Sequence, residues 1–114
     1  MDRKTERLFL DERIAVPKKV NSFVIMLEGQ IIGQITICLN QEISYEIYKE
    51  FEGHGYATEA LKSVMQIAFE NGREPLLIIY KGNIASQKVA QKAGFHIKSC
   101  HNEWWEWRAT KKPE

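Results

Sequence analysis

The stretch EGHGYATEAL, Glu52 to Leu61, has the residue types of an anion-binding loop. Gly53 and Gly55 allow the backbone to turn sharply where a Cβ would clash. The apolar residues that follow share one face of a helix: Ala57, Leu61, Val64 and Ala68. A helix that begins on glycines directs unpaired backbone N–H groups and the positive end of its dipole at open space, where phosphate is the usual ligand. The alternative is a strand–helix connection that merely requires small residues.

Two glutamates precede this loop and are candidates for proton transfer. Glu42 and Glu46 lie four positions apart, and alternation along the expected strand Ile43 to Tyr48 places both on one face. A carboxylate beside a reacting group can act as a general base. The alternative is that both are solvent-facing strand residues.

The elements that position these groups follow from hydrophobic periodicity and turn residues. Besides the strand at Ile43, five strand segments are expected before and after the loop, with a β-hairpin between the second and third and an antiparallel pair at the end. They are Arg7–Leu10, Phe23–Leu27, Ile31–Leu39, Phe95–Ser99 and Trp104–Arg108. One helix follows the glycines and ends near Glu70, before Asn71-Gly72. The apolar run Leu76–Tyr80 then closes a right-handed crossover and should lie parallel to the strand at Ile43.

A second helix should begin at Asn83, a good N-cap, and end at Gly94. Its apolar face is expected to hold Ala85, Val89 and Ala93. Together these elements predict an α/β (α+β) fold with a mixed sheet.

Length and composition exclude several classes of protein. The 114 residues are expected to form a single domain, 1–114, and a net charge of +1 leaves no electrostatic footprint for nucleic acid. No apolar run is long enough to cross a bilayer and no signal-peptide core is visible, so a cytoplasmic protein without membrane contact is expected. Cys38 and Cys100 lack metal-ligand or redox spacing and are interpreted as reduced packing residues.

Two segments together carry a family resemblance. The first is Glu52 to Leu61 and the second is GNIASQKVAQKAGF, Gly82 to Phe95. They resemble the GCN5-related N-acetyltransferase (GNAT) superfamily, and more closely its ribosomal-protein-alanine acetyltransferase branch, in a shortened form. In the second segment the residues on the family pattern are Asn83, Ser86, Val89, Lys92, Gly94 and Phe95. The resemblance implies N-terminal antiparallel strands and two parallel strands that splay apart around the cofactor.

The resemblance implies acetyl-CoA as co-substrate and assigns its contacts. Backbone groups of two strand residues would meet the pantetheine arm, the loop would hold the pyrophosphate, and Asn83 and Ser86 would face the thiol end, while Lys88 or Lys92 would reach toward the phosphates. The cofactor-binding residues so implied are Ile47, Tyr48, Gly53, His54, Gly55, Tyr56, Ala57, Thr58, Asn83, Ser86 and Lys92.

The implied reaction is acetyl transfer to a primary amine of a small molecule or of a protein N-terminus. Such an enzyme positions an uncharged amine, removes a proton and stabilises an oxyanion, with neither a protein nucleophile nor a metal. Glu46, Glu42 and Ser86 are the catalytic candidates. A catalytically weak acyl-CoA-binding module is the alternative, and a purely structural interaction protein is the third.

Three features depart from the family pattern. Only Asp11 to Asn21 stands where family members usually carry two helices that wall the acceptor site. Ala90 occupies the position where many members place a tyrosine as general acid, so water or Ser86 would take that role. Glu52 stands where Arg or Gln is typical, and its charge is expected to turn into solvent or to pair with a lysine or His54.

Two further patterns bear on the cofactor and on assembly. A dinucleotide fingerprint would need a third glycine where Thr58 stands, and a parallel unit rather than hairpins before the loop. Trp105 and Trp107 share one face of the last strand and Trp104 lies on the other, so both faces should meet apolar groups. A homodimer that covers one of these faces is expected.

Overall fold

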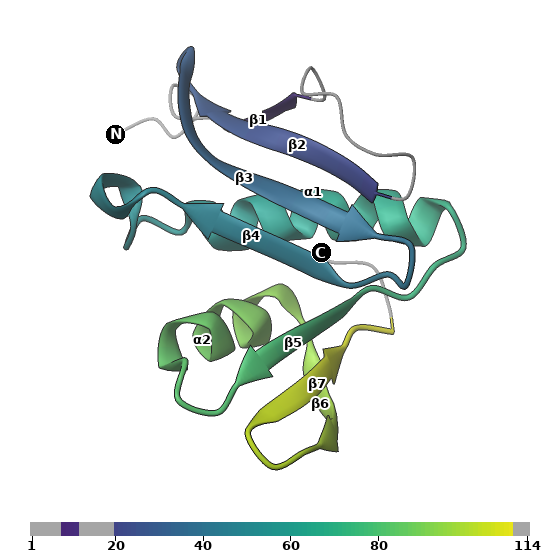
Figure 1. Ribbon diagram of the computed structural model, residues 1–114. Coiled ribbons are helices and arrows are strands. Elements are labelled where there is room, and N and C mark those ends of the chain that lie inside the picture. Colours follow the sequence, from purple (N-terminus) through teal and green to yellow (C-terminus); the bar gives the residue numbers. More distant parts are fainter. Residues whose placement is uncertain (1–7, 12–19, 111–114) are drawn as a thin grey trace.

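The computed structural model describes residues 8–11 and 20–110 of the chain (Figure 1). The order of elements confirms the predicted mixture of strands and helices. The strands are β1 (Leu8–Asp11), β2 (Val20–Leu27), β3 (Gln30–Cys38), β4 (Ile43–Ile47), β5 (Leu76–Tyr80), β6 (His96–Cys100) and β7 (Trp104–Arg108). The helices are α1 (Tyr56–Glu70) and α2 (Ile84–Ala93), and a short 3₁₀ turn, η2 (Lys49–Phe51), follows β4.

Two antiparallel sheets make up the strand framework. The first has four strands in the order β1–β2–β3–β4, and the second has three in the order β5–β7–β6, so the last strand inserts between β5 and β6. Helix α1 lies against one face of the first sheet, and α2 lies beside β5 next to the second sheet (Figure 1). The predicted hairpin and the closing antiparallel pair are confirmed by the β2–β3 and β6–β7 registers.

The two sheets meet where β4 and β5 begin. A parallel bridge joins Glu42 to Leu76, and the Leu76 N–H donates to the Gln41 carbonyl at 3.0 Å. Within residues 8–11 and 20–110, β4 and β5 form no other ladder, and the two strands diverge from this point (Figure 1). The predicted parallel arrangement is therefore confirmed, and the strands splay as the family resemblance implies.

One hydrophobic core joins both sheets and both helices. Helix α1 contributes its predicted face together with neighbouring side chains, and the buried set is Tyr56, Ala60, Leu61, Val64, Met65 and Ala68. Ala57 is only half-buried. No helix in the described part of the chain is long and apolar enough to cross a bilayer.

The predicted apolar face of α2 is wrong in part. Ala90 and Ala93 are the residues that α2 buries, whereas Ala85 is exposed and Val89 is half-buried. The helix packs through its smallest side chains because α1 lies alongside it. Val89 and Ala85 are thereby turned toward the cleft described below.

Several smaller expectations need correction. Cys100 is exposed and Cys38 half-buried, and both are free thiols, so Cys100 is not a packing residue. Strand β4 ends at Ile47, one residue earlier than predicted. The connection predicted over 11–21 is shorter, because Asp11 belongs to β1 and residues 20 and 21 belong to β2. Residues 12–19 lie outside the described part of the chain.

The tryptophans divide between the two faces of β7 as expected. Trp107 is 2% exposed and Trp105 packs against the core, while Trp104 stacks on His101 with ring centroids 3.8 Å apart. The homodimer stays a prediction.

Gly33 fixes the approach of β3 to β4 just before the cleft. A Cβ at Gly33 would lie 2.1 Å from the Glu46 carbonyl oxygen and 3.1 Å from the Ile47 Cα. Both contacts are with backbone, so no side chain can swing aside to relieve them. The same region of β3 carries the register shift against β2, opposite Ile25 and Met26.

We predict that Gly33→Ala lowers the free energy of unfolding by about 3 kcal/mol and the melting temperature by roughly 10 °C or more. Gly82→Ala is the matched control, since a Cβ there meets nothing within 4 Å and no positive φ is involved. Thermal unfolding of the two variants measures the difference. Equal melting temperatures would show that β4 can move away from β3 at little cost.

Candidate active site

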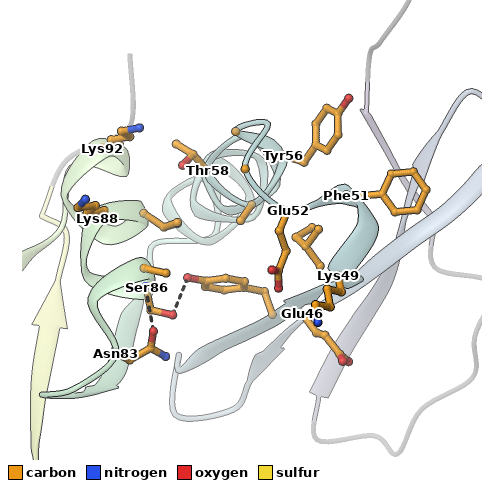
Figure 2. A pocket seen from close by; sticks show the side chains of 17 residues that line it. Glu46, Lys49, Phe51, Glu52, Tyr56, Thr58, Asn83, Ser86, Lys88 and Lys92 are labelled. Atoms are coloured by element: carbon orange, nitrogen blue, oxygen red, sulfur yellow. Dashed lines mark hydrogen bonds between the residues drawn. The ribbon is translucent and has the colours of Figure 1, made fainter.

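A cleft of about 870 Å³ opens between the C-terminal end of β4, the start of α1 and one side of α2 (Figure 2). Its walls carry three lysines against two glutamates, among apolar and hydroxyl-bearing side chains. The lining residues are Tyr45, Glu46, Ile47, Lys49, Phe51, Glu52, Gly53, Gly55, Tyr56, Ala57, Thr58, Asn83, Ala85, Ser86, Lys88, Val89 and Lys92. The cleft is therefore large enough for a cofactor and mildly cationic.

The glycine loop forms one end of this cleft. Gly53 and Gly55 have φ angles of +83° and +84°, a conformation that L side chains rarely adopt, and open space lies where each Cβ would be. Gly55 is the N-cap of α1 and no side chain caps the helix. Within the described residues, the backbone N–H groups of Gly53, Gly55 and Ala57 form no hydrogen bond. This end of the cleft can hold an anion, as the loop sequence predicts.

Helix α2 forms the facing wall. The Asn83 side chain caps it by accepting a hydrogen bond from the Ser86 N–H at 3.1 Å, which confirms the predicted N-cap. The Gln87 amide donates to the Lys81 carbonyl at 2.7 Å and fixes the turn between β5 and α2. Lys88 and Lys92 extend from successive turns of this wall (Figure 2). They bring positive charge to the side of the cleft that faces the glycine loop.

Strand β4 forms the floor of the cleft. It carries Tyr45, a lining residue that the sequence analysis did not identify as part of the site. The Tyr45 hydroxyl donates to the Ser86 Oγ at 3.3 Å, so a hydrogen bond joins β4 to α2 across the cleft. Burial raises the pKa of Tyr45, an effect that the hydrogen bond with Ser86 partly offsets. The signal in the sequence was ambiguous, because alternation alone marks Tyr45 as an ordinary core residue of a strand.

The two candidate bases, Glu42 and Glu46, lie in different surroundings in the structure. Glu46 lines the cleft, is exposed, and accepts a hydrogen bond from the Gln34 amide at 3.4 Å. Glu42 does not line the cleft, because it lies at the closed end of the split where β4 meets Leu76. Of the two, only Glu46 is placed where a reacting amine can approach.

Two of the expected cofactor contacts also fall outside the lining. The Tyr48 N–H donates to the Ile32 carbonyl and the Tyr48 carbonyl accepts from the Phe51 N–H, both at 2.8 Å. Both backbone groups of Tyr48 therefore already have hydrogen-bond partners within the protein. His54 is exposed, and its ring stacks on Tyr56 with centroids 5.5 Å apart. The turn η2, which the sequence did not reveal, redirects the chain here and brings Phe51 to the cleft.

Glu52 has an unexpected orientation. Its side chain is exposed, yet it is directed from the loop into the cleft, between Ser86 and Lys49 (Figure 2). Within the described residues it forms no ion pair, so the expected partner lysine or His54 is not found there. A carboxylate therefore stands beside the proposed anion site without a neutralising partner among those residues.

Comparison with known proteins agrees with this architecture. Residues 2–96 match the model of a family described as the acetyltransferase (GNAT) domain. The uncharacterized protein YkkB of Bacillus subtilis is 31% identical over 85 residues, which are 67% of this chain and 49% of YkkB. The chain thus spans about half the length of that relative.

Solved structures show the same fold. An acetyltransferase from Agrobacterium tumefaciens is 28% identical and superposes with a TM-score of 0.69, covering 81% of this chain and 61% of that protein. The PaiA N-acetyltransferase of Thermoplasma acidophilum, solved with coenzyme A, has 15% identity and a TM-score of 0.73, with coverages of 82% and 62%. The family match over most of the described sequence, together with the split between β4 and β5, shows that this chain belongs to the GNAT acetyltransferase family.

Proposed function

We propose that this chain binds acetyl-CoA in the cleft and transfers the acetyl group to a primary amine of a small molecule or of a protein N-terminus. The observation that carries the proposal is the uncapped start of α1, which opens into the same cleft as Asn83, Ser86 and the α2 lysines. In this proposal the loop binds the phosphates and the groups from α2 face the thioester, and both line one cavity.

In this proposal each wall has one task. The N–H groups of the loop from Gly53 to Thr58 bind the pyrophosphate, and Lys88 and Lys92 add attraction at longer range. The edge of β4 at Ile47 meets the pantetheine arm in the split. Tyr48 and His54 contribute through the shape of the turn and loop rather than by direct contact.

The chemistry requires an uncharged amine next to the thioester. Glu46 is the proposed general base, because its carboxylate is exposed at the edge of the cleft, where an amine can approach. The ribosomal-protein-alanine branch is supported by the residues on pattern from Asn83 to Phe95, and it stays a proposal.

One observation favours the second candidate, an acyl-CoA-binding module of weak activity. Ala90 is fully buried, so the helix position where many family members have a tyrosine offers only a methyl group packed in the core. Binding and turnover therefore need separate tests.

Acetyl-CoA should stabilise the folded protein. At a concentration of about 100 times its dissociation constant it should add about 2.7 kcal/mol, which is a rise of several degrees in melting temperature. Ala57→Glu should remove most of this rise, because a carboxylate would stand where the pyrophosphate binds. Ser63→Glu adds the same group on the exposed side of α1 and should keep it. Thermal unfolding with and without acetyl-CoA gives the comparison, and an unchanged melting temperature in the unmodified protein would rule out the binding site.

Glu46→Gln should lower turnover roughly 100-fold while the affinity for acetyl-CoA stays nearly the same. Glu42→Gln is the matched control and should retain turnover, since Glu42 lies outside the cleft. Thiol release from acetyl-CoA can be followed with a panel of small primary amines and peptides with an N-terminal alanine. Full activity of Glu46→Gln would show that water removes the proton.

Glu52→Arg should strengthen acetyl-CoA binding about 10-fold at low salt, because it replaces repulsion of the pyrophosphate by attraction. The gain should shrink as salt rises. Glu50→Arg makes the same charge change on an exposed residue outside the lining and should have a much smaller effect. Calorimetric titration at two salt concentrations measures both. A loss of affinity in Glu52→Arg would instead reveal that this carboxylate holds the loop in shape.

A further inference from the structure

The exposed ring of Tyr80, at the end of β5, is a feature of the split that the cofactor-binding cleft leaves unused. Tyr80 is 62% exposed, the largest exposed fraction among the large hydrophobic side chains of the described residues. It does not line the cleft between β4, α1 and α2. Within residues 8–11 and 20–110 no ring stacks on it. A single exposed apolar side chain is ordinary on a protein surface, so its position has to show whether it has a role.

The strand register places Tyr80 across the split from Glu46. The parallel bridge joins Glu42 to Leu76, and side chains paired in this way point to the same face of the sheet. Glu46 and Tyr80 each lie four residues beyond the bridge, and neither the β3–β4 nor the β5–β7 ladder shifts its register there. Because side chains alternate with a period of two, both point to the same face as the bridged pair. They therefore stand opposite each other at the open end, toward which the arrowheads of β4 and β5 point (Figure 1).

This face of the split is turned away from the two helices. The residues that alternate with Glu46 and Tyr80 point the other way: Tyr45 is hydrogen-bonded to α2, and Leu77 and Ile79 are buried in the core. The glycine loop and the α2 lysines, which bind the cofactor in the proposed function, also belong to the helix side. A second molecule can therefore reach the split from the outer face while the cofactor occupies the inner one.

Trp104 extends the aromatic surface beyond Tyr80. It is the cross-strand partner of Tyr80 in the β5–β7 ladder, so the two side chains are neighbours on the outer face. His101 stacks on Trp104, with ring centroids 3.8 Å apart. The charged residues further along this face of β7, Glu106 and Arg108, pair with each other at 2.6 Å. The outer aromatic surface, formed by Tyr80 and Trp104, is therefore suited to a flat, uncharged group.

The backbone beneath this surface is held from two directions. The Tyr80 carbonyl accepts a hydrogen bond from the Asn83 N–H, and the Lys81 N–H donates to the Glu103 carbonyl, both at 3.0 Å. These bonds tie the end of β5 to the start of α2 and to the turn between β6 and β7. A ring that a fixed backbone presents loses little freedom on binding, which favours its use as a contact.

We propose that the outer aromatic surface binds the acceptor, and that Tyr80 selects primary amines that carry an aromatic ring a few bonds from the nitrogen. The inference rests on the proposed function, because it takes Glu46 as the place where the amine reacts. Paired strands lie about 4.8 Å apart, and β4 and β5 are further apart at the open end, so nitrogen and ring must be separated by roughly 5 Å or more. A small arylalkylamine and a protein N-terminus that begins with an aromatic residue share this chemistry.

Compounds that join coenzyme A to an amine test the proposal without turnover. In each compound the sulfur carries a CH₂–CO group that forms an amide with the amine, so one molecule occupies both sides of the split. Calorimetry compares the phenylethylamine compound with the hexylamine compound, and the compound of the peptide Phe-Ala-Ala with that of Ala-Ala-Ala. The unmodified protein should bind the aromatic member of at least one pair about 10-fold more tightly, which is the effect of one ring contact.

Variants of Tyr80 assign this preference to its ring. Tyr80→Ala should reduce the preference to about 2-fold, whereas Tyr80→Phe keeps the ring and should retain it. Leu39→Ala is the matched control, because Leu39 is 59% exposed and follows β3 at the closed end of the split, and it should retain the full preference. Coenzyme A alone should bind all three variants as it binds the unmodified protein, since neither residue lines its cleft.

The outcomes are distinct. A preference confined to the amine pair identifies a small acceptor and one confined to the peptide pair identifies a protein N-terminus, and either supports the inference if Tyr80→Ala loses it. Equal affinities within both pairs, or a full preference in Tyr80→Ala, would overturn the inference and leave the proposed function intact. Failure of coenzyme A and of all four compounds to bind would overturn both. Dissociation of a dimer in Tyr80→Ala with an unchanged preference would show that a second copy of the chain covers this surface, and would also overturn the inference.

Discussion

The site depends on one constraint, which is that β4 and β5 are joined at one end and held apart at the other. The bridge between Glu42 and Leu76 fixes the closed end. Beyond it each strand is paired on its far side only, β4 with β3 and β5 with β7. The facing edges carry backbone groups that an extended ligand can use, as in other cases where a chain adds to the edge of a sheet.

The surrounding elements keep this split open and supply the polar groups that line it. Gly33 allows β3 to approach β4 so closely that a side chain would not fit, and this holds the end of β4 in position. The chain then turns through η2 into the glycine loop, which starts α1 at the mouth of the split. On the other side the Asn83 cap sets the start of α2, and the bond between Tyr45 and Ser86 connects the two walls. The glycine loop and the Ser86 hydroxyl are thereby located in one cavity.

Much of this could be predicted from local sequence, because the signals are local. The α1 face apart from Ala57, the Asn83 cap and the stop at Gly94 follow from short-range rules and are confirmed. The errors come from features that depend on distant contacts. Tyr48 looked like a strand residue facing the cofactor, but η2 begins just after it and its peptide pairs with Ile32. Glu42 and Glu46 share a strand face, yet the split opens only beside the second. Tyr45 could not be found from periodicity, since its partner is 41 positions away.

The central claim is that the split between β4 and β5 receives the cofactor, and a crystal structure of the protein soaked with acetyl-CoA tests it most directly. The account predicts density for the pyrophosphate at the N–H groups of Gly53 to Thr58 and for the pantetheine arm between the two strands beside Ile47, with the sulfur near Ser86. Density for the cofactor elsewhere on the molecule, with the split left empty, would contradict it.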